Sequence, residues 1–278
     1  MRIKHYVKNL LIFMPLFFAG KALEVESLIE CIIGFGVFSL AASFVYVVND
    51  ILDVEADRRH ETKKCRPIAC GDISVKSASR FAVLLLIVAA GLSMLLVNRE
   101  AAWALIFLYV VMNVAYSVKL KKVALVDVSV IAIGFIIRIS YGGFIIGVPV
   151  SNWMYLTVMA MSFYLALGKR RNELLKNGVA SREVLRSYTR GFLDKMMYVF
   201  LGLAIVFYSL WCVSPNEFMQ TEILIWTVPL VILICMRYSM NIECEETGDP
   251  ADVFFGDRVL VALAVIYSML LGILLYFA

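Results

Sequence analysis

The chain consists of long apolar runs separated by short polar segments. A helix needs about 20 apolar residues to cross the hydrocarbon core of a bilayer. Eight runs approach or reach that length, and a shorter N-terminal run at 6–20, which contains Pro15, makes a ninth. The pattern therefore predicts nine membrane-spanning helices. The eight longer runs lie at about 28–48, 79–97, 101–118, 124–147, 151–168, 196–213, 221–238 and 257–277.

The composition agrees with this interpretation, because 62% of the residues are hydrophobic and only 17% are charged. Such a balance excludes a soluble globular protein. We expect an all-α fold, a single integral membrane bundle over residues 1–278, and no nucleic-acid partner. The six cysteines form no C-x-x-C pair and there are two histidines, so we expect no disulfide, structural zinc or histidine-based metal site.

The distribution of basic residues predicts the orientation. If the N-terminus is cytoplasmic and the spans alternate, all of the 26 lysines and arginines except Lys21, Arg99 and Arg138 belong to the cytoplasmic side. The positive-inside rule favours this arrangement. We therefore expect a multi-pass protein of the plasma (inner) membrane. Because the chemistry lies in cytoplasmic loops and the spans are nearly free of charge, an enzyme is favoured over a transporter.

An acidic motif, Asn49-Asp50-x-x-Asp53-x-x-x-Asp57, directly follows the 28–48 run. On a helix these three aspartates share one face within roughly 80°. Like charges at that spacing repel each other unless a cation lies between them, and Mg²⁺ prefers carboxylate oxygens that it shares with phosphate. We predict Asp50 and Asp53 as Mg²⁺ ligands, with Asn49 contacting phosphate or orienting a carboxylate. The alternative is a solvated helix end.

Basic and aromatic residues at the ends of neighbouring spans are candidates for binding phosphate. Arg66, in a turn with Pro67, suits bidentate phosphate contact, and Lys63 precedes it. A polybasic loop that binds anionic lipid is the alternative. Tyr116 and Lys119 end the 101–118 run, where a tyrosine also serves as an interfacial anchor.

The second large cytoplasmic loop, 169–195, is strongly basic. Lys169, Arg170 and Glu173 continue the helix of the 151–168 run, and we expect them to line the site. Lys169 and Glu173 are four residues apart, so a surface ion pair is the alternative. Arg138 lies inside a span, about 16 Å along the helix from Asp127, its only charged companion there. It needs another partner or a lipid phosphate, and a structural role is equally open.

In combination these stretches resemble the UbiA superfamily of intramembrane prenyltransferases, along nearly the whole chain. In detail they are most similar to its decaprenyl-phosphate phosphoribosyltransferase branch. Typical aromatic prenyltransferases of the superfamily have a second Asp-rich motif, where this chain has Gly-Lys-Arg-x-x-Glu. The supporting stretches are Val7-Lys8-Asn9-Leu10 with Pro15, Asn49 to Arg58, Thr62 to Ala69, Gly168 to Glu173, Ser187-Tyr188-Thr189 and Asp257 to Leu260.

The resemblance implies a nine-span fold that transfers the phosphoribosyl group from phosphoribosyl diphosphate (PRPP) to a polyprenyl phosphate, with Mg²⁺ on Asp50 and Asp53. Asp57 would complete metal binding through water or hold a ribose hydroxyl. A sugar 5-phosphate and a lipid phosphate call for more cations than a prenyl diphosphate does. The implied phosphate contacts are Lys8, Arg66, Lys119, Lys169, Arg170 and Tyr188.

Two other functions stay open at this point. The first is a UbiA-type aromatic prenyltransferase that makes a quinone or haem precursor with the same fold and metal. The second is a lipid-phosphate transporter or binding protein without chemistry. The missing second Asp-rich motif argues against the former, and the acidic motif with nearly uncharged spans argues against the latter. The oligomeric state, including a homo-oligomer, is not indicated by the sequence.

Overall fold

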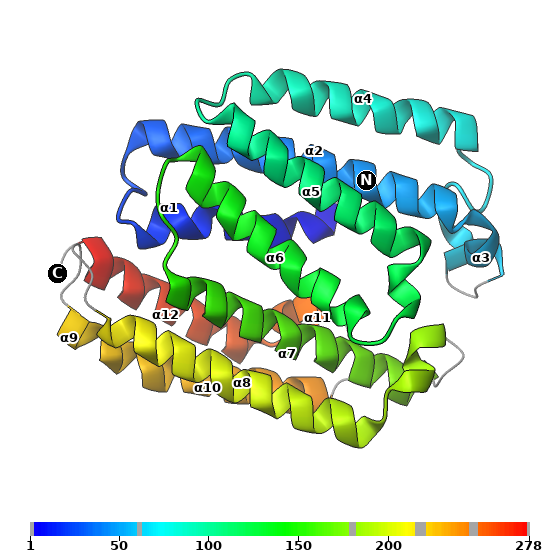
Figure 1. Ribbon diagram of the computed structural model, residues 1–278. Helices are drawn as coiled ribbons and strands as arrows, with labels where there is room; N and C mark the ends of the chain where they lie inside the picture. The colour runs from blue at the N-terminus through cyan, green and yellow to red at the C-terminus, as the bar shows by residue number, and fades with distance from the viewer. Residues whose placement is uncertain (1–2, 60–62, 178–181, 215–220, 245–249, 277–278) are drawn as a thin grey trace. The chain divides into compact units, whose positions relative to one another are not determined.

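The structure is a computed structural model that describes residues 3–59, 63–177, 182–214, 221–244 and 250–276. All regular elements within these ranges are helical, and the described residues contain no strand (Figure 1). The predicted all-α fold is therefore confirmed. The helices group into two compact units, each of which has its own apolar core. That the chain is a single domain stays a prediction.

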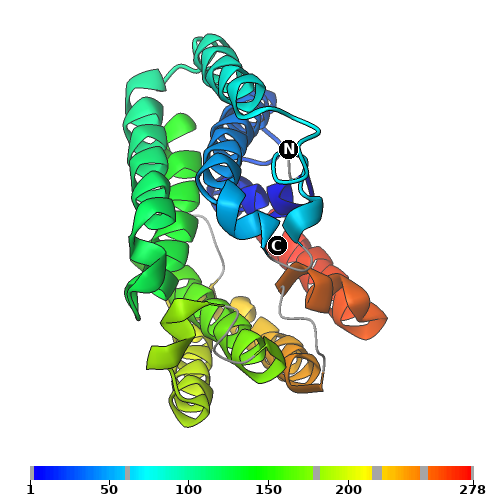
Figure 2. The same cartoon turned by 90° about the vertical axis from the view of Figure 1, so that its right-hand side faces the viewer.

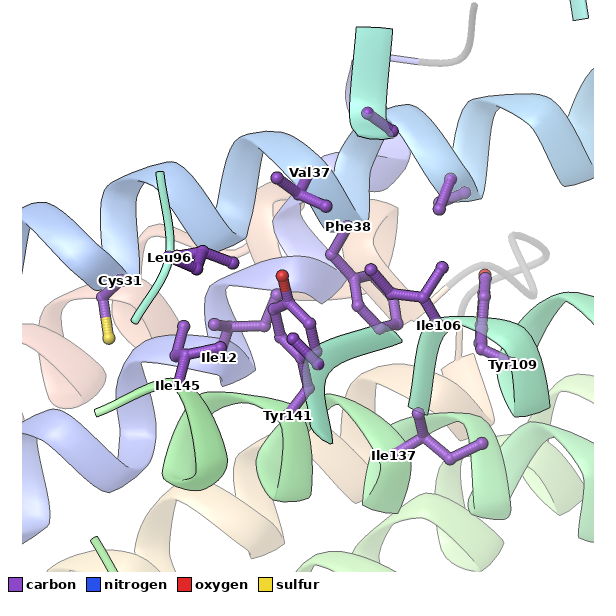
Figure 3. Close-up of a cluster of buried hydrophobic side chains, with 14 of the residues drawn as sticks. Ile12, Cys31, Val37, Phe38, Leu96, Ile106, Tyr109, Ile137, Tyr141 and Ile145 are labelled. Atoms are coloured by element: carbon purple, nitrogen blue, oxygen red, sulfur yellow. The ribbon is translucent and has the colours of Figure 1, made fainter. Parts of the chain in front are cut away.

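Unit 1 comprises the chain up to Phe17 together with Lys21–Lys121 and Ile137–Pro149. The long helix α2 packs against α4, α5 and η1. Its core gathers around Phe38 of α2 and Tyr141 of α6, whose ring centroids are 5.3 Å apart (Figure 3). The elements are η1 (Ile3–Phe13), α1 (Met14–Phe18), α2 (Val25–Leu52), α3 (Val54–Arg58), η2 (Lys63–Cys65), α4 (Val75–Ser93), α5 (Arg99–Val118), η3 (Leu120–Lys122) and the second half of α6 (Val126–Ile145).

Unit 2 comprises Phe18–Gly20, Lys122–Ile136 and the chain from Val150. Helices α7 and α8 lie side by side along their length, as both views show (Figures 1 and 2), and α10 packs against α8 and α12. The core of this unit includes Tyr164, Leu193 and Ile242. Its further elements are α7 (Asn152–Asn177), η5 (Glu183–Ser187), α8 (Arg190–Val213), α9 (Thr221–Leu224), η6 (Ile225–Thr227), α10 (Val228–Cys244), α11 (Pro250–Gly256) and α12 (Arg258–Tyr276).

Seven helices among the described residues are long and apolar enough to cross a membrane, and they correspond to seven of the eight longer predicted runs. The remaining run, 151–168, lies in α7, whose C-terminal part carries the polar sequence Lys169-Arg170-Arg171-Asn172-Glu173. The N-terminal run forms a shorter apolar helix at Tyr6–Phe18. The count of nine spans and the cytoplasmic N-terminus therefore stay predictions.

Candidate active site

The acidic motif lies where α2 meets α3. Helix α2 ends at Leu52, and Asp53 is both its C-cap and the residue before α3. The backbone N–H of Asp53 donates to Asn49 O (2.9 Å) and that of Asp57 donates to Asp53 O (2.8 Å), so helical hydrogen bonding continues through the joint. The regular α-helix is interrupted at Asp53, between α2 and α3, but the three aspartates remain on successive turns.

Arg66 connects two of these aspartates. Its Nη1 lies 3.2 Å from Asp50 Oδ1 and 2.5 Å from Asp57 Oδ2. Asp57 is buried, whereas the Asp50 side chain keeps 20% of its surface exposed. A guanidinium shared by two carboxylates removes much of the repulsion between them. The shared contact confirms that Asp50 and Asp57 face the same side of the helix.

A tight turn positions Arg66. The N–H of Cys70 donates to Arg66 O (2.9 Å), and that of Ile73 donates to Pro67 O (3.0 Å). Gly71 has a φ of +94°, a conformation that side chains with a Cβ rarely adopt. The predicted turn around Arg66-Pro67 is therefore present, and its backbone bonds restrain the base of the arginine side chain. The side chain of the other predicted cation of this loop, Lys63, lies outside the described residues.

Asp53 has a different cation. Lys121 Nζ, in the short η3 helix, lies 2.5 Å from Asp53 Oδ1, and both side chains are about one-quarter exposed, at 26% and 25%. Lys119, the lysine that we predicted here, is the exposed C-cap residue of α5. Lys121 was therefore not among the site residues predicted from the sequence. The clue was present, because Lys121 belongs to the same basic cluster at the end of the same span.

The donor set fits a shared metal rather than a metal held by the protein alone. Among the described residues, no three His, Cys, Asp or Glu side chains converge on one point. Asp50 and Asp53 nevertheless supply partly exposed carboxylate oxygens, which are hard ligands. Mg²⁺ commonly takes one or two carboxylates and completes its octahedron with water and substrate phosphates. These two residues therefore suit a magnesium ion that arrives with a diphosphate.

The remaining candidates of unit 1 lie on three helices. Lys8 is on η1, Asn49 is in the last turn of α2, and Tyr116 is in the last turn of α5. All three side chains are half-buried. Their burial permits contact with a ligand but does not require one, so their phosphate contacts stay predictions.

Unit 2 contains a second ionic cluster, which is almost completely buried. Arg170 of α7 is 1% exposed and Asp127 of α6 is 0% exposed. Arg170 Nε donates to Asp127 Oδ2 (2.6 Å), and Arg170 Nη1 donates to Glu173 Oε2 (2.7 Å). Arg182 Nε lies 3.3 Å from the same Glu173 oxygen. The cluster therefore ties the helices α6 and α7 together.

Tyr188 closes this cluster. Its hydroxyl donates to Asp127 Oδ1 (2.6 Å) and accepts the backbone N–H of Leu125 (2.7 Å). Burial raises the pKa of Tyr188, and the hydrogen bond to Asp127 raises it further, so the hydroxyl stays protonated and can donate. Leu125 has a φ of +66°, a strained value for a leucine, and the bond from its N–H helps to hold it there.

The polar atoms of Arg170, Glu173 and Tyr188 are thus engaged with protein groups. That Arg170 and Tyr188 contact phosphate stays a prediction, and their geometry favours a structural task. Glu173 pairs with Arg170 and with Arg182, and the alternative surface pair of Lys169 with Glu173 stays a prediction. Lys169 is half-buried. Asp127 was not predicted as a partner of Arg170, although an acid in the first turn of an apolar helix needs a cation.

Comparison with known proteins identifies the family. Residues 10–263 match the UbiA prenyltransferase family. The chain belongs to this family. The match extends over both ionic clusters and over most of each compact unit. The predicted UbiA resemblance is therefore confirmed.

Two relatives of this UbiA family member are similar over almost its whole length. The decaprenyl-phosphate phosphoribosyltransferase of Mycobacterium tuberculosis is 34% identical over 279 residues, which cover 98% of this chain and 91% of the relative. The protein of the same name from Corynebacterium glutamicum is 32% identical over 285 residues, covering 99% and 85%. A UbiA homolog from Archaeoglobus fulgidus, solved with GPP and Mg²⁺, superposes with a TM-score of 0.73 at 16% identity, covering 98% of this chain and 95% of that one, which shows the shared fold.

A smaller group of hydrogen bonds around the carboxylate of Asp257 supports the last helix of this UbiA family member. Asp257 Oδ1 accepts the N–H of Val259 (2.8 Å) and of Leu260 (3.4 Å), so it caps α12. Its Oδ2 accepts from Arg237 Nε (2.5 Å) and Asn241 Nδ2 (2.6 Å). These bonds, the one from Arg237 foremost, hold the pKa of Asp257 well below its usual range.

Proposed function

We propose that this UbiA family member transfers the 5-phosphoribosyl group of PRPP to the phosphate of a polyprenyl phosphate and releases diphosphate. Full-length similarity to relatives named decaprenyl-phosphate phosphoribosyltransferase supports this reaction. The observation that carries it is the partly exposed cluster in which Asp50, Asp53 and Asp57 alternate with Arg66 and Lys121. Such a cluster offers both carboxylates for a metal and cations for phosphate.

Asp50 and Asp53 are the residues that would hold Mg²⁺ together with the donor diphosphate. The ion, when bound, neutralises the negative charge that develops on the leaving diphosphate. Arg66 and Lys121 lie against the same carboxylates, so their cationic groups are within reach of diphosphate oxygens that bind there. The nucleophile is a phosphate oxygen of the lipid, which is already an anion. A general base is therefore not required, and binding, orientation and charge compensation do most of the catalytic work.

Asp57 has a different task. It is buried and forms the shorter of the two contacts with Arg66, at 2.5 Å against 3.2 Å for Asp50. A buried carboxylate in this position fixes the guanidinium, whereas the more exposed Asp50 can exchange its contact for a metal. We therefore assign Asp57 the orientation of Arg66. The alternatives for Asp57 are the two roles that the family resemblance implies, which are metal binding through water and a contact with a ribose hydroxyl.

We infer that the reaction takes place at the cytoplasmic face of the plasma membrane. PRPP is a highly charged, water-soluble donor, and the basic loops predicted on that side provide complementary charge. The apolar helices hold the polyprenyl chain within the bilayer. Lys169 and the residues of the Arg170 cluster are retained as further phosphate contacts only by the family resemblance.

A transfer assay with purified full-length protein in detergent tests the proposal. The protein is incubated with PRPP labelled in the ribose, Mg²⁺ and a polyprenyl phosphate, and the lipid fraction is extracted. Label in that fraction, lost when EDTA is added and restored by excess Mg²⁺, supports the reaction. The same protein is given a prenyl diphosphate with an aromatic acceptor. Turnover of that pair without ribose transfer overturns the proposal in favour of an aromatic prenyltransferase.

A further inference from the structure

The N-terminal segment of unit 1 has an unusual helical form. Residues Ile3–Phe13 form a 3-10 helix of 11 residues, whereas such helices seldom exceed four residues. A 3-10 helix has three residues per turn, so side chains three positions apart lie directly above one another. Tyr6, Asn9 and Ile12 therefore form one straight row. Something outside the helix must stabilise this conformation over so many residues.

The row is fastened to α2 by two hydrogen bonds. The hydroxyls of Tyr6 and Ser43 are 2.6 Å apart, and Asn9 Nδ2 donates to Ser39 Oγ (2.9 Å). Three residues of a 3-10 helix rise about 6 Å, and four residues of an α-helix also rise about 6 Å. The spacing of Tyr6 and Asn9 thus matches that of Ser43 and Ser39 on an antiparallel neighbour. An α-helical N-terminal segment would lose this match.

Helix α6 holds the same row from another direction. Arg138 Nε donates to Asn9 Oδ1 (2.8 Å), and Arg138 Nη2 donates to the Tyr109 hydroxyl (3.2 Å). The Cζ atom of Arg138 also lies 5.0 Å from the ring centroids of Phe38 and Tyr109. Figure 3 shows these two aromatic side chains within the core of unit 1. Cation–π and hydrogen-bond contacts therefore hold the buried guanidinium against Asn9.

Gly142, one turn after Arg138, completes the fastening. A Cβ atom at this position would lie 2.1 Å from the carbonyl oxygen of Ile12, so only glycine permits the approach of the two backbones. The 6 Å match is repeated here, since Asn9 and Ile12 are three residues apart and Arg138 and Gly142 are four. The position of η1 along α6 is thus set by the buried cation Arg138 and by Gly142, which has no side chain.

The other faces of η1 differ from this row. Lys8, next to the clamped Asn9, is half-buried. Val7 and Leu10 are 41% and 53% exposed, so η1 presents an apolar surface beside a cation. A phosphate that is attached to a hydrocarbon chain matches this combination, because its head needs the cation and its tail needs the apolar surface. A free sugar diphosphate has no hydrocarbon tail, so it needs the cation but not the apolar surface.

We propose that Arg138 and Asn9 are positioning residues, which hold η1 in its 3-10 register and so place the Lys8 ammonium against the phosphate of the lipid acceptor. The inference rests on the proposed phosphoribosyl transfer, and it adds a site for the acceptor and a task for the buried arginine. Arg138 and Asn9 do not touch the substrate. They act through the direction in which η1 presents Lys8.

A double-mutant cycle tests the proposal. Lys8→Ala removes the cation. Asn9→Leu removes the hydrogen bonds of the Asn9 side chain to Ser39 and Arg138 while keeping a similar volume. Each change is expected to raise the KM for polyprenyl phosphate roughly 10- to 100-fold, which is the effect of losing one charged hydrogen bond. The KM for PRPP should change less than about twofold. Because both changes remove the same interaction, the double variant should be little worse than Lys8→Ala alone.

Two further variants and one control make the cycle specific. Asn9→Asp keeps side-chain oxygens that accept hydrogen bonds from Arg138 and Ser39. Its KM for polyprenyl phosphate should therefore stay much closer to that of the unaltered protein than the KM of Asn9→Leu does. Arg138→Lys keeps the charge but loses the planar guanidinium, so this variant should have a raised KM for polyprenyl phosphate. Asn113→Leu is the matched control, since the side-chain amide of Asn113 donates to the carbonyl of Tyr109 in its own helix, and the change should leave both KM values unchanged. Elution as a single peak in detergent confirms that each variant is folded.

The outcomes separate this inference from the proposed function. If the unaltered protein does not transfer ribose, the proposed function fails and takes the inference with it. If transfer occurs and Lys8→Ala leaves the acceptor KM unchanged, or raises the PRPP KM instead, the acceptor site is wrong. If the effects of Lys8→Ala and Asn9→Leu simply multiply in the double variant, Asn9 supports the fold alone and the positioning role is wrong.

Discussion

The two ionic clusters use the same residue types and differ in their access to water. In unit 1, Arg66 and Lys121 meet aspartates that, apart from Asp57, remain 20–25% exposed. In unit 2, Arg170 and Asp127 are at most 1% exposed. Partly hydrated ion pairs contribute little net stability and can be rearranged. Breaking a buried ion pair leaves an uncompensated charge in the protein interior, which is strongly destabilising. The difference indicates that the first cluster can receive a ligand and that the second maintains the structure.

The largest expected effect is on catalysis at the first cluster. Asp50→Asn and Asp53→Asn each keep the side-chain shape and remove the charge that a metal needs. We expect kcat/KM for ribose transfer to fall about 10³-fold or more, the cost of losing a central electrostatic contact. Thermal unfolding in detergent should show a nearly unchanged midpoint. Retained turnover in both variants would exclude these residues as metal ligands. It would also contradict the proposed difference between a ligand-binding first cluster and a structural second cluster.

The corresponding change at the second cluster should act on stability. Arg170→Met leaves Asp127 buried without its cation, which costs about 3–5 kcal/mol. The double variant Arg170→Met with Asp127→Leu replaces the pair by apolar groups and should recover most of that loss. The measurement is the unfolding midpoint in detergent. A stable Arg170→Met protein with a raised KM for PRPP would instead place Arg170 at the substrate.

Adjacent lysines provide a matched comparison of intermediate size. Lys121 contacts Asp53, whereas Lys122 contacts Glu183 in a largely exposed pair. Lys121→Ala should lower kcat/KM roughly 10- to 100-fold, as expected for one charged hydrogen bond. Lys122→Ala should leave transfer unchanged, because exposed pairs contribute little. Equal effects of the two substitutions on steady-state kinetics would show that general positive charge, rather than the contact with Asp53, is what matters.

The smallest expected effect is a pH dependence at Asp257. The hydrogen bonds from Arg237 and Asn241 lower the pKa of Asp257 in the folded protein. A lowered pKa contributes stability above the unfolded value of about 3.9, and this stability is lost as the pH falls toward the folded pKa. Asp257→Asn should therefore be less stable than the unaltered protein at pH 7. The gap in unfolding midpoint should narrow below about pH 4, and a gap that widens in acid would contradict the assignment.

The sequence allowed the fold class and much of the first cluster to be predicted. Apolar runs of spanning length predicted the helices, and the spacing of Asp50 and Asp57 predicted their common face. The turn at Arg66 could be recognised because Pro67 and Gly71 are local signals. These features depend on neighbouring residues along the chain, and periodicity and turn chemistry describe such features well.

The errors and omissions concern contacts between distant segments. Helical periodicity cannot distinguish Lys121 from Lys119 as the partner of Asp53. The pairing of Asp127 with Arg170, and that of Asn9 with Arg138, depends on how helices far apart in the sequence pack. The burial of Arg66 and Arg170 also could not be inferred, since these two arginines both lie in basic segments outside the apolar runs.

Helix α7 has a consequence for the biogenesis of the protein. It is not among the strongly apolar helices, its C-terminal part contains the buried residues Arg170, Arg171 and Asn172, and it packs along α8. Arginine is among the residues that a translocon inserts least readily. We therefore expect α7 to be released into the bilayer only together with α8, as a hairpin. A ribosome stalled between these two helices would leave α7 accessible to modification from the aqueous side.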